Sequence, residues 1–220
     1  MLAQAFGPRF SDDDSVVVFA SGVSNSAETA QHAFDREASL LDASLQRARR
    51  LVYFSSCAVA NPHQSPTPYF AHKQRMEAMV LAEQQLVFRL PQVVGRSANP
   101  KTLTNFLYRC ISEGAHFTLH RGVERNLIDV DHVALIAQDI LERCPFPMPD
   151  PISIATPESL TMRKIVDEFE RVLGRRGIYT ESNLTAPFPI ETSVCLASAA
   201  RVGISFDETY LPKMLRKYYG

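Results

Sequence analysis

Apolar runs alternate with amphipathic stretches along the first half of the chain. Residues 16–20, 51–54 and 86–90 are short runs dominated by β-branched, leucine and aromatic side chains. Such runs are typical of strands that are buried on both faces of a parallel sheet. Between them, residues 26–50 and 69–84 carry apolar side chains at helical spacing, with charged residues on the remaining positions. The order strand, helix, strand, helix, strand predicts parallel strands joined by right-handed crossovers.

The second half of the chain contains shorter segments with clearer boundaries. The pattern predicts helices at residues 103–112, 133–143, 162–173 and 211–218, and short strands at residues 117–119, 125–130 and 152–154. Thr67 before Pro68 is typical of a helix N-terminus, and Thr161 and Gly174 are placed to begin and end the helix between them.

Glycine and proline mark two further boundaries. Residues 1–6 predict a short apolar helix that stops at Gly7 and Pro8. Residues 145–151 contain four prolines and predict a connector. The chain contains no internal repeat.

Composition narrows the class of protein. Hydrophobic residues make up 45% of the 220 residues and charged residues 21%, which is ordinary for a folded domain and excludes a disordered or collagen-like chain. The net charge is −1, so no strong field is available to attract nucleic acid or an anionic membrane. The four cysteines form no Cys-x-x-Cys pair, and no apolar run is long enough to span a bilayer. We therefore expect a cytoplasmic protein with reduced cysteines, no bound metal, and no nucleic-acid or membrane partner.

The candidate chemistry lies at the start of the helix 69–84. Tyr69 and Lys73 are four residues apart and so share one helix face. A fixed ammonium beside a phenol favours the phenolate, which predicts that Tyr69 acts as an acid or base nearer to neutral pH. Ser56 ends the second predicted strand, at the sheet edge where ligands of parallel sheets bind, and could hydrogen-bond the reacting oxygen. The Tyr-x-x-x-Lys pair alone is common by chance, and its placement after a strand, a Ser-Ser pair and a proline-rich loop gives it meaning.

Four motifs in order resemble those of the extended short-chain dehydrogenases/reductases, also called the NAD-dependent epimerase/dehydratase family. They are residues 51–59 (Ser-Ser-x-x-Val), Pro68-Tyr69 with Lys73, residues 89–95 (Arg-x-x-Asn-x-x-Gly, with Gln92 at the Asn position), and residues 125–134. The resemblance covers roughly residues 16–140. It implies an α/β fold, namely a Rossmann-like doubly wound parallel sheet with a small C-terminal substrate-binding lobe.

The resemblance also implies a division of the chain and an oligomeric state. Residues 1–96 would form the dinucleotide-binding core, residues 97–122 a segment of the substrate lobe, residues 123–150 a return to the core, and residues 151–220 the C-terminal lobe. Members of this family pair through two long helices. A homodimer through the helices around residues 27–48 and 69–84 is therefore expected.

Site residues follow from the resemblance position by position. The catalytic residues would be Ser56, Tyr69 and Lys73, with Lys73 also holding the nicotinamide ribose of NAD or NADP. The residues expected to line the cofactor are Met1, Leu2, Ala20, Ser21, Tyr69, Lys73, Leu90, Pro91 and Val93. Ser56, Gln92 and Arg125 would face the substrate, because a guanidinium can bind the diphosphate of a nucleotide sugar bidentately.

The chain also departs from the family pattern. The glycine-rich loop that cradles the pyrophosphate is absent, and Met1, Leu2 and Ala3 would follow its second glycine, so we expect a first strand and this loop to precede Met1. The stretch that selects NAD or NADP is missing too. Asn126 stands where the family has Asp, and His132 replaces an acid near the end of the last motif. An altered substrate side is therefore expected.

Two functions remain open at this point. The first is an NAD(P)-dependent enzyme that acts on a nucleotide-diphosphate sugar. Reduction or epimerisation is favoured over dehydration, since Cys57 and Ala58 occupy the positions of the acidic pair of dehydratases. The alternative is a catalytically degenerate sensor or scaffold that binds a dinucleotide or a nucleotide sugar.

Other polar residues have simpler interpretations. His72 lies close to Tyr69 on the predicted helix but is expected to be a solvated helix residue. The hydroxyl-rich residues 21–26 either contact phosphate or ribose or form a turn in which Ser26 caps the next helix. His116 and His120 alternate along a short strand without an acidic third ligand, which argues against a metal site.

Overall fold

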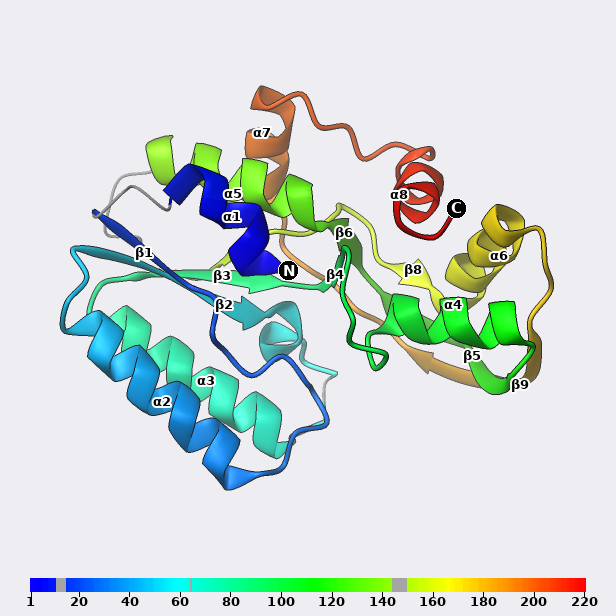
Figure 1. Ribbon diagram of the computed structural model, residues 1–220, viewed down its shortest axis with the longest axis horizontal. Coiled ribbons are helices and arrows are strands. Elements are labelled where there is room, and N and C mark those ends of the chain that lie inside the picture. The colour runs from blue at the N-terminus through cyan, green and yellow to red at the C-terminus, as the bar shows by residue number, and fades with distance from the viewer. Residues whose placement is uncertain (11–14, 64, 144–149) are drawn as a thin grey trace.

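A four-stranded parallel sheet forms the larger part of the molecule. The computed structural model describes residues 1–10, 15–63, 65–143 and 150–220. The strands lie side by side in the order β1 (Val16–Phe19), β2 (Arg50–Ser56), β3 (Leu86–Leu90) and β7 (Ile152–Ser153), all parallel. Helices cover both faces of this sheet (Figure 1). The predicted doubly wound α/β core is confirmed.

Side chains alternate between the two faces of the sheet because successive residues of a strand point in opposite directions. Leu51, Tyr53 and Val87 are buried in the core beneath α2 (Gln31–Leu45) and α3 (Pro68–Ala82). An apolar run with no polar interruption is therefore what a strand in this position requires.

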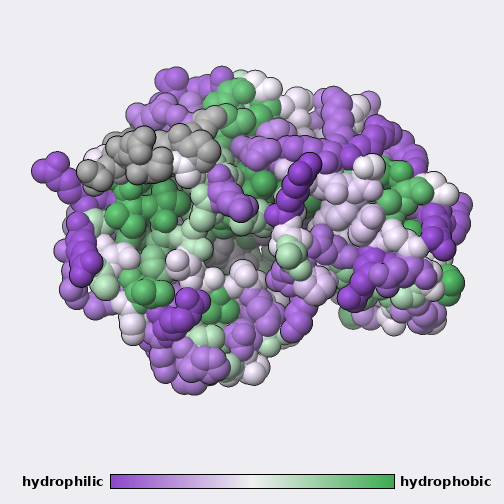
Figure 2. Space-filling view, viewed as in Figure 1, coloured by the Kyte–Doolittle hydropathy of each residue, from purple (hydrophilic) through white to green (hydrophobic). Residues whose placement is uncertain are grey.

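The opposite face of the sheet packs against three other helices. Val52 and Phe54 lie in the core formed with α1 (Leu2–Phe10), α5 (Val130–Arg143) and α7 (Ser193–Arg201). Hydrophobic side chains around β1 remain visible on the surface, where Figure 2 shows them gathered near the edge of the sheet. No helix among the described residues is both long enough and apolar enough to cross a membrane.

A second lobe is built on a separate small sheet. β5 (His116–Arg125) pairs in parallel with β9 (Ile178–Ala186) and antiparallel with β8 (Leu160–Thr161). β4 (Gln92–Val94) and β6 (Leu127–Asp129) form a parallel pair between this lobe and the larger sheet (Figure 1).

Three helices cover the lobe sheet and close its core. α4 (Leu103–Glu113), α6 (Met162–Leu173) and α8 (Tyr210–Tyr219) contribute buried side chains to one hydrophobic cluster that also contains Leu119. A β-carbon on Gly122 would overlap the side chain of Thr185. The irregular pairing of β5 with β9 therefore needs a glycine at this position.

Predicted helix boundaries are confirmed where a side chain caps the helix. The Thr67 hydroxyl accepts a hydrogen bond from the Phe70 amide at 3.3 Å at the start of α3. The Thr161 hydroxyl does the same for Lys164 at the start of α6, and Gly174 ends this helix with φ +61°. These residues are the expected caps because their side chains or backbone freedom satisfy terminal groups.

Two predicted boundaries are wrong. Ser26 does not cap a helix, since α2 begins at Gln31 and the Glu28 carboxylate instead accepts from the amides of Thr29 and Ala30 at 3.0 and 2.9 Å. The first helix does not stop at Gly7 and Pro8 but runs on to Phe10. Its apolar side chains at helical spacing, including Phe6, pack on the core and hold the helix through these residues.

β9 and α7 are among the elements that the sequence pattern did not predict. β9 carries mostly polar, exposed residues, and α7 contains many small residues, so neither has a strong apolar period. Of the proline-rich connector predicted at residues 145–151, residues 144–149 lie outside the described part of the chain.

Candidate active site

Ser56, Tyr69 and Lys73 lie at the carboxyl edge of the parallel sheet. Ser56 is the last residue of β2, and a short 3₁₀ helix (Cys57–Ala60) turns the chain away from it. Tyr69 and Lys73 lie on the first turns of α3, with the Lys73 Nζ atom 5.9 Å from the centre of the Tyr69 ring. The Ser56 Oγ atom accepts from the Ala58 amide at 3.2 Å, which leaves its own proton available to a ligand.

Lys73 is enclosed by polar partners. Its side chain is almost entirely buried, and its ammonium donates to the Glu37 Oε1 atom and to the Tyr53 hydroxyl oxygen, both at 2.9 Å. Burial lowers the pKa of Lys73, while the adjacent Glu37 carboxylate acts in the opposite direction. A buried charge is tolerated only when it is paired and hydrogen-bonded, and both conditions hold here.

Glu37 is the centre of this cluster and has no exposed surface. Its Oε1 atom accepts from the Tyr53 hydroxyl at 2.7 Å as well as from Lys73, and its Oε2 atom accepts from the Val23 amide at 2.6 Å and faces the His72 Nε2 atom at 3.0 Å. Burial opposes ionisation, but the Lys73 charge and these hydrogen bonds prevail and lower the pKa of Glu37.

The loop after β1 closes over the cluster. A β-carbon on Gly22 would lie 2.9 Å from the Glu37 Oε1 atom and 3.0 Å from the Lys73 Nζ atom. Only a glycine lets the backbone approach these two groups so closely. The glycine at position 22 is therefore explained by packing against the buried ion pair.

The ionisation of Tyr69 runs against the expectation from its lysine neighbour. Burial and the negative charge of Glu37 raise the pKa of Tyr69 to about 12. Because Glu37 pairs with Lys73, the ammonium does not act on the phenol as an uncompensated cation. In this structure Tyr69 is therefore a protonated phenol at neutral pH.

His72 is not the solvated residue that the sequence indicated. It is 6% exposed, its ring stacks on Phe34 with 4.6 Å between ring centres, and it contacts Glu37. Burial lowers the pKa of His72, so the neutral ring donates a hydrogen bond to the carboxylate. The reason is geometric: α3 turns this residue, together with Lys73, toward α2.

Besides Tyr69 and Lys73 on α3, the residues expected to line a cofactor lie after β1, from the end of β3 into β4, and at the start of α1. Ala20 and Ser21 follow β1, and Pro91 links β3 to β4. The remaining members of the set are Leu90 at the end of β3, Val93 in β4, and Met1 and Leu2 at the start of the first helix. Val93, Leu90 and Leu2 pack in the core on the α1 side of the sheet, and a β-carbon on Gly95 would lie 2.8 Å from the Met1 sulfur. Met1 thus lies beside the end of β4.

Gln92 and Arg125 lie on neighbouring strands. Gln92 begins β4 with an exposed side chain. Its backbone amide donates to the backbone carbonyl oxygen of Asn126 at 3.0 Å. Arg125 ends β5, and its guanidinium donates to the Glu124 carbonyl oxygen at 2.7 Å. Within the described residues Arg125 has no carboxylate partner, and its burial lowers its pKa. A half-buried guanidinium of this kind suits an anionic ligand.

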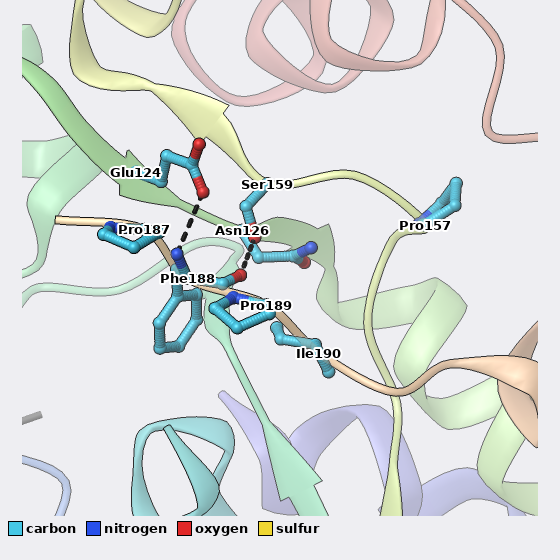
Figure 3. Close-up of a pocket in the computed structure, with 8 residues that line it drawn as sticks. All are labelled: Glu124, Asn126, Pro157, Ser159, Pro187, Phe188, Pro189 and Ile190. Atoms are coloured by element: carbon cyan, nitrogen blue, oxygen red, sulfur yellow. Dashed lines mark hydrogen bonds between the residues drawn. The ribbon is translucent and has the colours of Figure 1, made fainter. Parts of the chain in front are cut away.

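A pocket of about 320 Å³ opens beside the end of β5 (Figure 3). Its lining consists of Glu124, Asn126, Pro157, Ser159, Pro187, Phe188, Pro189 and Ile190. The Glu124 carboxylate accepts from the Phe188 amide at 2.9 Å and the Ser159 hydroxyl donates to the Phe188 carbonyl, which fixes the segment after β9. The Asn61 side chain donates to the Pro187 carbonyl oxygen at 3.3 Å, so the pocket wall is joined to the loop after Ser56. Arg125 itself does not line the pocket.

A search of the described residues for clusters of three or more potential metal ligands found none. Cys57, Cys110 and Cys195 are free and buried. Burial raises the pKa of Cys57 to about 12, so its thiol stays protonated.

Known structures share this architecture. A UDP-glucuronic acid 4-epimerase from Bacillus cereus, solved with UDP-glucuronic acid and NAD, superposes with a TM-score of 0.70 at 15% identity over 97% of this chain and 76% of that one. The chain has the fold of the nucleotide-sugar epimerases. The UDP-glucose 4-epimerase of Thermus thermophilus with NAD gives a TM-score of 0.70 at 16% identity, over 98% and 81% of the two chains.

The same fold extends to dehydratases. A dTDP-glucose 4,6-dehydratase from Bacillus anthracis, in complex with NAD, matches with a TM-score of 0.69 at 15% identity, over 92% of this chain and 71% of that one. No protein-family model matches the sequence, and neither does any curated protein. The fold expected from the sequence motifs is therefore confirmed by structure.

The nucleotide-sugar epimerase fold carries one polar cluster here that sequence reasoning missed. Glu37 and Tyr53 were not recognised, although Glu37 lies at helical spacing between the buried residues Phe34 and Leu41. A charged residue on an otherwise apolar helix face is the signal that would have found it.

Proposed function

We propose that the chain is an NAD(P)-dependent enzyme that oxidises or reduces a ring carbon of a nucleotide-diphosphate sugar. One observation supports this above the others. Ser56, Tyr69 and Lys73 lie at one edge of a parallel sheet, in a fold shared with enzymes whose structures contain NAD and UDP-glucuronic acid. Ligands of such sheets bind at this edge.

The donor chemistry at Lys73 fits a nicotinamide ribose. An ammonium has three donors, and in the described residues two are used, by Glu37 and Tyr53. The third, together with the Tyr69 hydroxyl, would hold the ribose hydroxyls, while the backbone at Ala20, Ser21, Leu90, Pro91 and Val93 would line the rest of the cofactor, with Met1 and Leu2 beside it. When bound, such a cofactor supplies hydride transfer to or from carbon.

The remaining steps belong to residues of this chain. Tyr69 would give a proton to a carbonyl oxygen or take one from a hydroxyl, and Ser56 would donate a hydrogen bond to the same oxygen. Arg125, which is half-buried and lacks a carboxylate partner among the described residues, would bind the substrate diphosphate, with Gln92 beside it on β4.

Reduction or epimerisation is favoured over dehydration. Cys57 and Ala58 follow Ser56, and neither supplies a carboxylate. The raised pKa of Cys57 also keeps its buried thiol from acting as a base at neutral pH.

The replacement Tyr69→Phe tests the proposal. Fluorescence titration should show binding of NADH or NADPH, and a panel of UDP- and dTDP-sugars should give turnover that falls by about 10²–10⁴-fold in this variant, because the proton donor is lost. The variant should keep its circular dichroism spectrum. Undiminished turnover in Tyr69→Phe, or failure of the unaltered protein to bind either cofactor, would exclude this function.

A second function is favoured by the engagement of Lys73. Because its ammonium is held by Glu37 and Tyr53 in the folded chain, the protein could bind a dinucleotide or nucleotide sugar without turning it over. In that case the same titrations would show binding, no member of the sugar panel would react, and Tyr69→Phe would bind as the unaltered protein does.

A further inference from the structure

Glu37 is a buried charged group to which the proposed chemistry assigns no role of its own. Its carboxylate has no exposed surface and contacts four donors from three segments: Val23 after β1, Tyr53 on β2, and His72 and Lys73 on α3. Removing a carboxylate from water is costly, and the cost is offset here because Glu37 pairs with the buried Lys73 ammonium. The role of Glu37 is therefore tied to that of Lys73.

The position of the carboxylate connects it with Tyr69. Lys73 lies one helical turn after Tyr69, and the Lys73 Nζ atom lies 5.9 Å from the Tyr69 ring. Without Glu37, this ammonium would be a buried cation beside the phenol, held only by Tyr53. The other nearby carboxylate, Glu77, is occupied by Arg89 at 2.6 and 3.0 Å. Glu37 is therefore the group that offsets the Lys73 charge at Tyr69.

We propose that Glu37 is a positioning residue of the Tyr69–Lys73 site, which fixes the Lys73 ammonium beside Tyr69 and compensates its charge. This inference rests on the proposed function, because it assigns Glu37 a role in the same site. With the Lys73 charge compensated, Tyr69 stays a phenol in the free protein.

The surrounding groups agree with this role. His72 faces the same carboxylate as a neutral ring, and Tyr53 donates to Glu37 while accepting from Lys73. Tyr53 and His72 therefore add no net charge near Tyr69 at neutral pH, since burial and Glu37 raise the pKa of Tyr53 and burial lowers the pKa of His72. The ionisation of Tyr69 is therefore governed by its burial and, among the charged groups around it, by the Glu37–Lys73 pair.

The test is the alkaline titration of Tyr69, followed by tyrosinate absorbance after subtraction of a matched protein that carries Tyr69→Phe. In the unaltered protein Tyr69 should give no signal over the pH range in which circular dichroism shows the fold intact. In Glu37→Gln, which keeps the shape but removes the charge, Tyr69 should titrate within this range, with its midpoint lowered by about one pH unit or more. An unchanged midpoint in a folded Glu37→Gln protein would overturn the proposal.

Asp139→Asn provides the matched control. It also removes a buried, ion-paired carboxylate, but from α5 on the other face of the sheet. A loss of general stability would affect both variants, whereas only Glu37→Gln should move the titration of Tyr69. A shift of the same size in Asp139→Asn would count against the proposal.

A second variant keeps the proposal testable if Glu37→Gln does not fold. The double replacement Glu37→Gln with Lys73→Met removes both charges, and replacing a whole buried ion pair is tolerated far better than removing one partner. If the two charges compensate each other at Tyr69, the double variant, like the unaltered protein, should give no Tyr69 signal over the pH range in which it stays folded. A Tyr69 titration within this range would refute the compensation. These titrations contain neither cofactor nor sugar. Their result for Glu37 is therefore independent of whether the protein turns over a nucleotide sugar, and the two proposals can be tested separately.

Discussion

Two polar residues that depart from the family pattern have clear partners in the structure. The Asn126 side chain donates to the Thr156 carbonyl oxygen at 2.9 Å and accepts from the Thr156 amide at 3.1 Å. An aspartate could not make both bonds, because an ionised carboxylate has no donor. His132 bonds the Tyr210 hydroxyl at 3.0 Å and so joins α5 to α8. Both side chains therefore hold segments of the fold together: Asn126 binds the segment around Thr156, and His132 binds α8 of the second lobe.

Asp139 shows how a single carboxylate makes stability depend on pH. On α5 it accepts from Ser198 at 2.8 Å and from the Arg201 Nε and Nη2 atoms at 2.9 and 2.6 Å, which ties α7 to the core. These bonds, chiefly that with Arg201, lower the pKa of Asp139 to about 2. Because the pKa is depressed on folding, the stabilisation is present above about pH 4 and is lost as the pH falls toward 2.

We therefore expect Asp139→Asn to lower the free energy of unfolding by about 2 kcal/mol at neutral pH. Near pH 2 most of the difference from the unaltered protein should disappear, because the carboxyl is then about half protonated in the folded protein and almost fully protonated in the unfolded chain. Urea denaturation at the two pH values measures this. Asp35→Asn, on the exposed face of α2, serves as the control. An equal loss at both pH values would show that the charge of Asp139 is not responsible.

At the residue scale, sequence reasoning found the features that depend on local spacing. Tyr69 and Lys73 share a helix face, and their placement at the start of a helix was visible in the capping residues before them. The Glu37–Lys73 pair was not, because its two members are 36 positions apart and meet only when α2 packs beside α3. The raised pKa of Tyr69 depends on this non-local contact and could not have been derived from the sequence.

The C-terminal helix is attached by a small set of polar contacts. Asp129, which is 2% exposed, accepts from Lys217 at 2.8 Å and from the Tyr218 hydroxyl at 2.7 Å, while Lys217 also reaches Asp131 at 2.7 Å. The side chains of Leu211 and Leu215 complete the attachment in the lobe core. The position of α8 therefore depends on one buried carboxylate at the end of β6.

Asp129→Asn should loosen α8 selectively. Hydrogen exchange followed by mass spectrometry is expected to show faster exchange in α8, with α2 and α3 unchanged, because the charge-assisted contacts of Asp129 belong to the lobe. Asp131→Asn, which removes only the more exposed contact, should have a smaller effect. If exchange in α8 were the same in Asp129→Asn as in the unaltered protein, the apolar contacts of α8 alone would be sufficient to hold this helix in place, which would contradict the prediction.

Elements with a strong apolar period or a capping side chain were predictable, and those without either were not. α3 and α6 begin at the expected threonines, since a cap is a local hydrogen bond. β9 has a largely exposed surface, and its strand conformation comes from pairing with β5 rather than from its own side chains. The extension of α1 through Pro8 likewise results from packing on the core.

At the scale of the whole molecule, the two helices on one face of the parallel sheet present an outer surface. Leu40 on α2 is a large apolar side chain that is 43% exposed. We propose a homodimer through α2 and α3. Light scattering after size-exclusion chromatography should give twice the 24.6 kDa mass of the chain, and Leu40→Glu should give a monomer by placing a charge in the interface.

Leu184→Glu is the matched control for this prediction. Leu184 is 53% exposed on β9, in the other lobe, and its replacement should leave the mass unchanged. A monomeric unaltered protein would contradict the homodimer. A Leu40→Glu protein that remains dimeric would show that Leu40 of α2 does not lie in the interface.

The pairing of β5 with β9 has a consequence for how the protein is made. The two strands are parallel neighbours, yet α5, β7, β8 and α6 all lie between them in the chain. During synthesis β5 emerges long before β9 exists, so the backbone edge of β5 that pairs with β9 has no partner strand in the meantime. The strands β1 to β3, which need only short crossovers, can assemble earlier. The nascent chain thus passes through a stage in which the first three strands of the larger sheet exist while β5 still lacks its parallel partner.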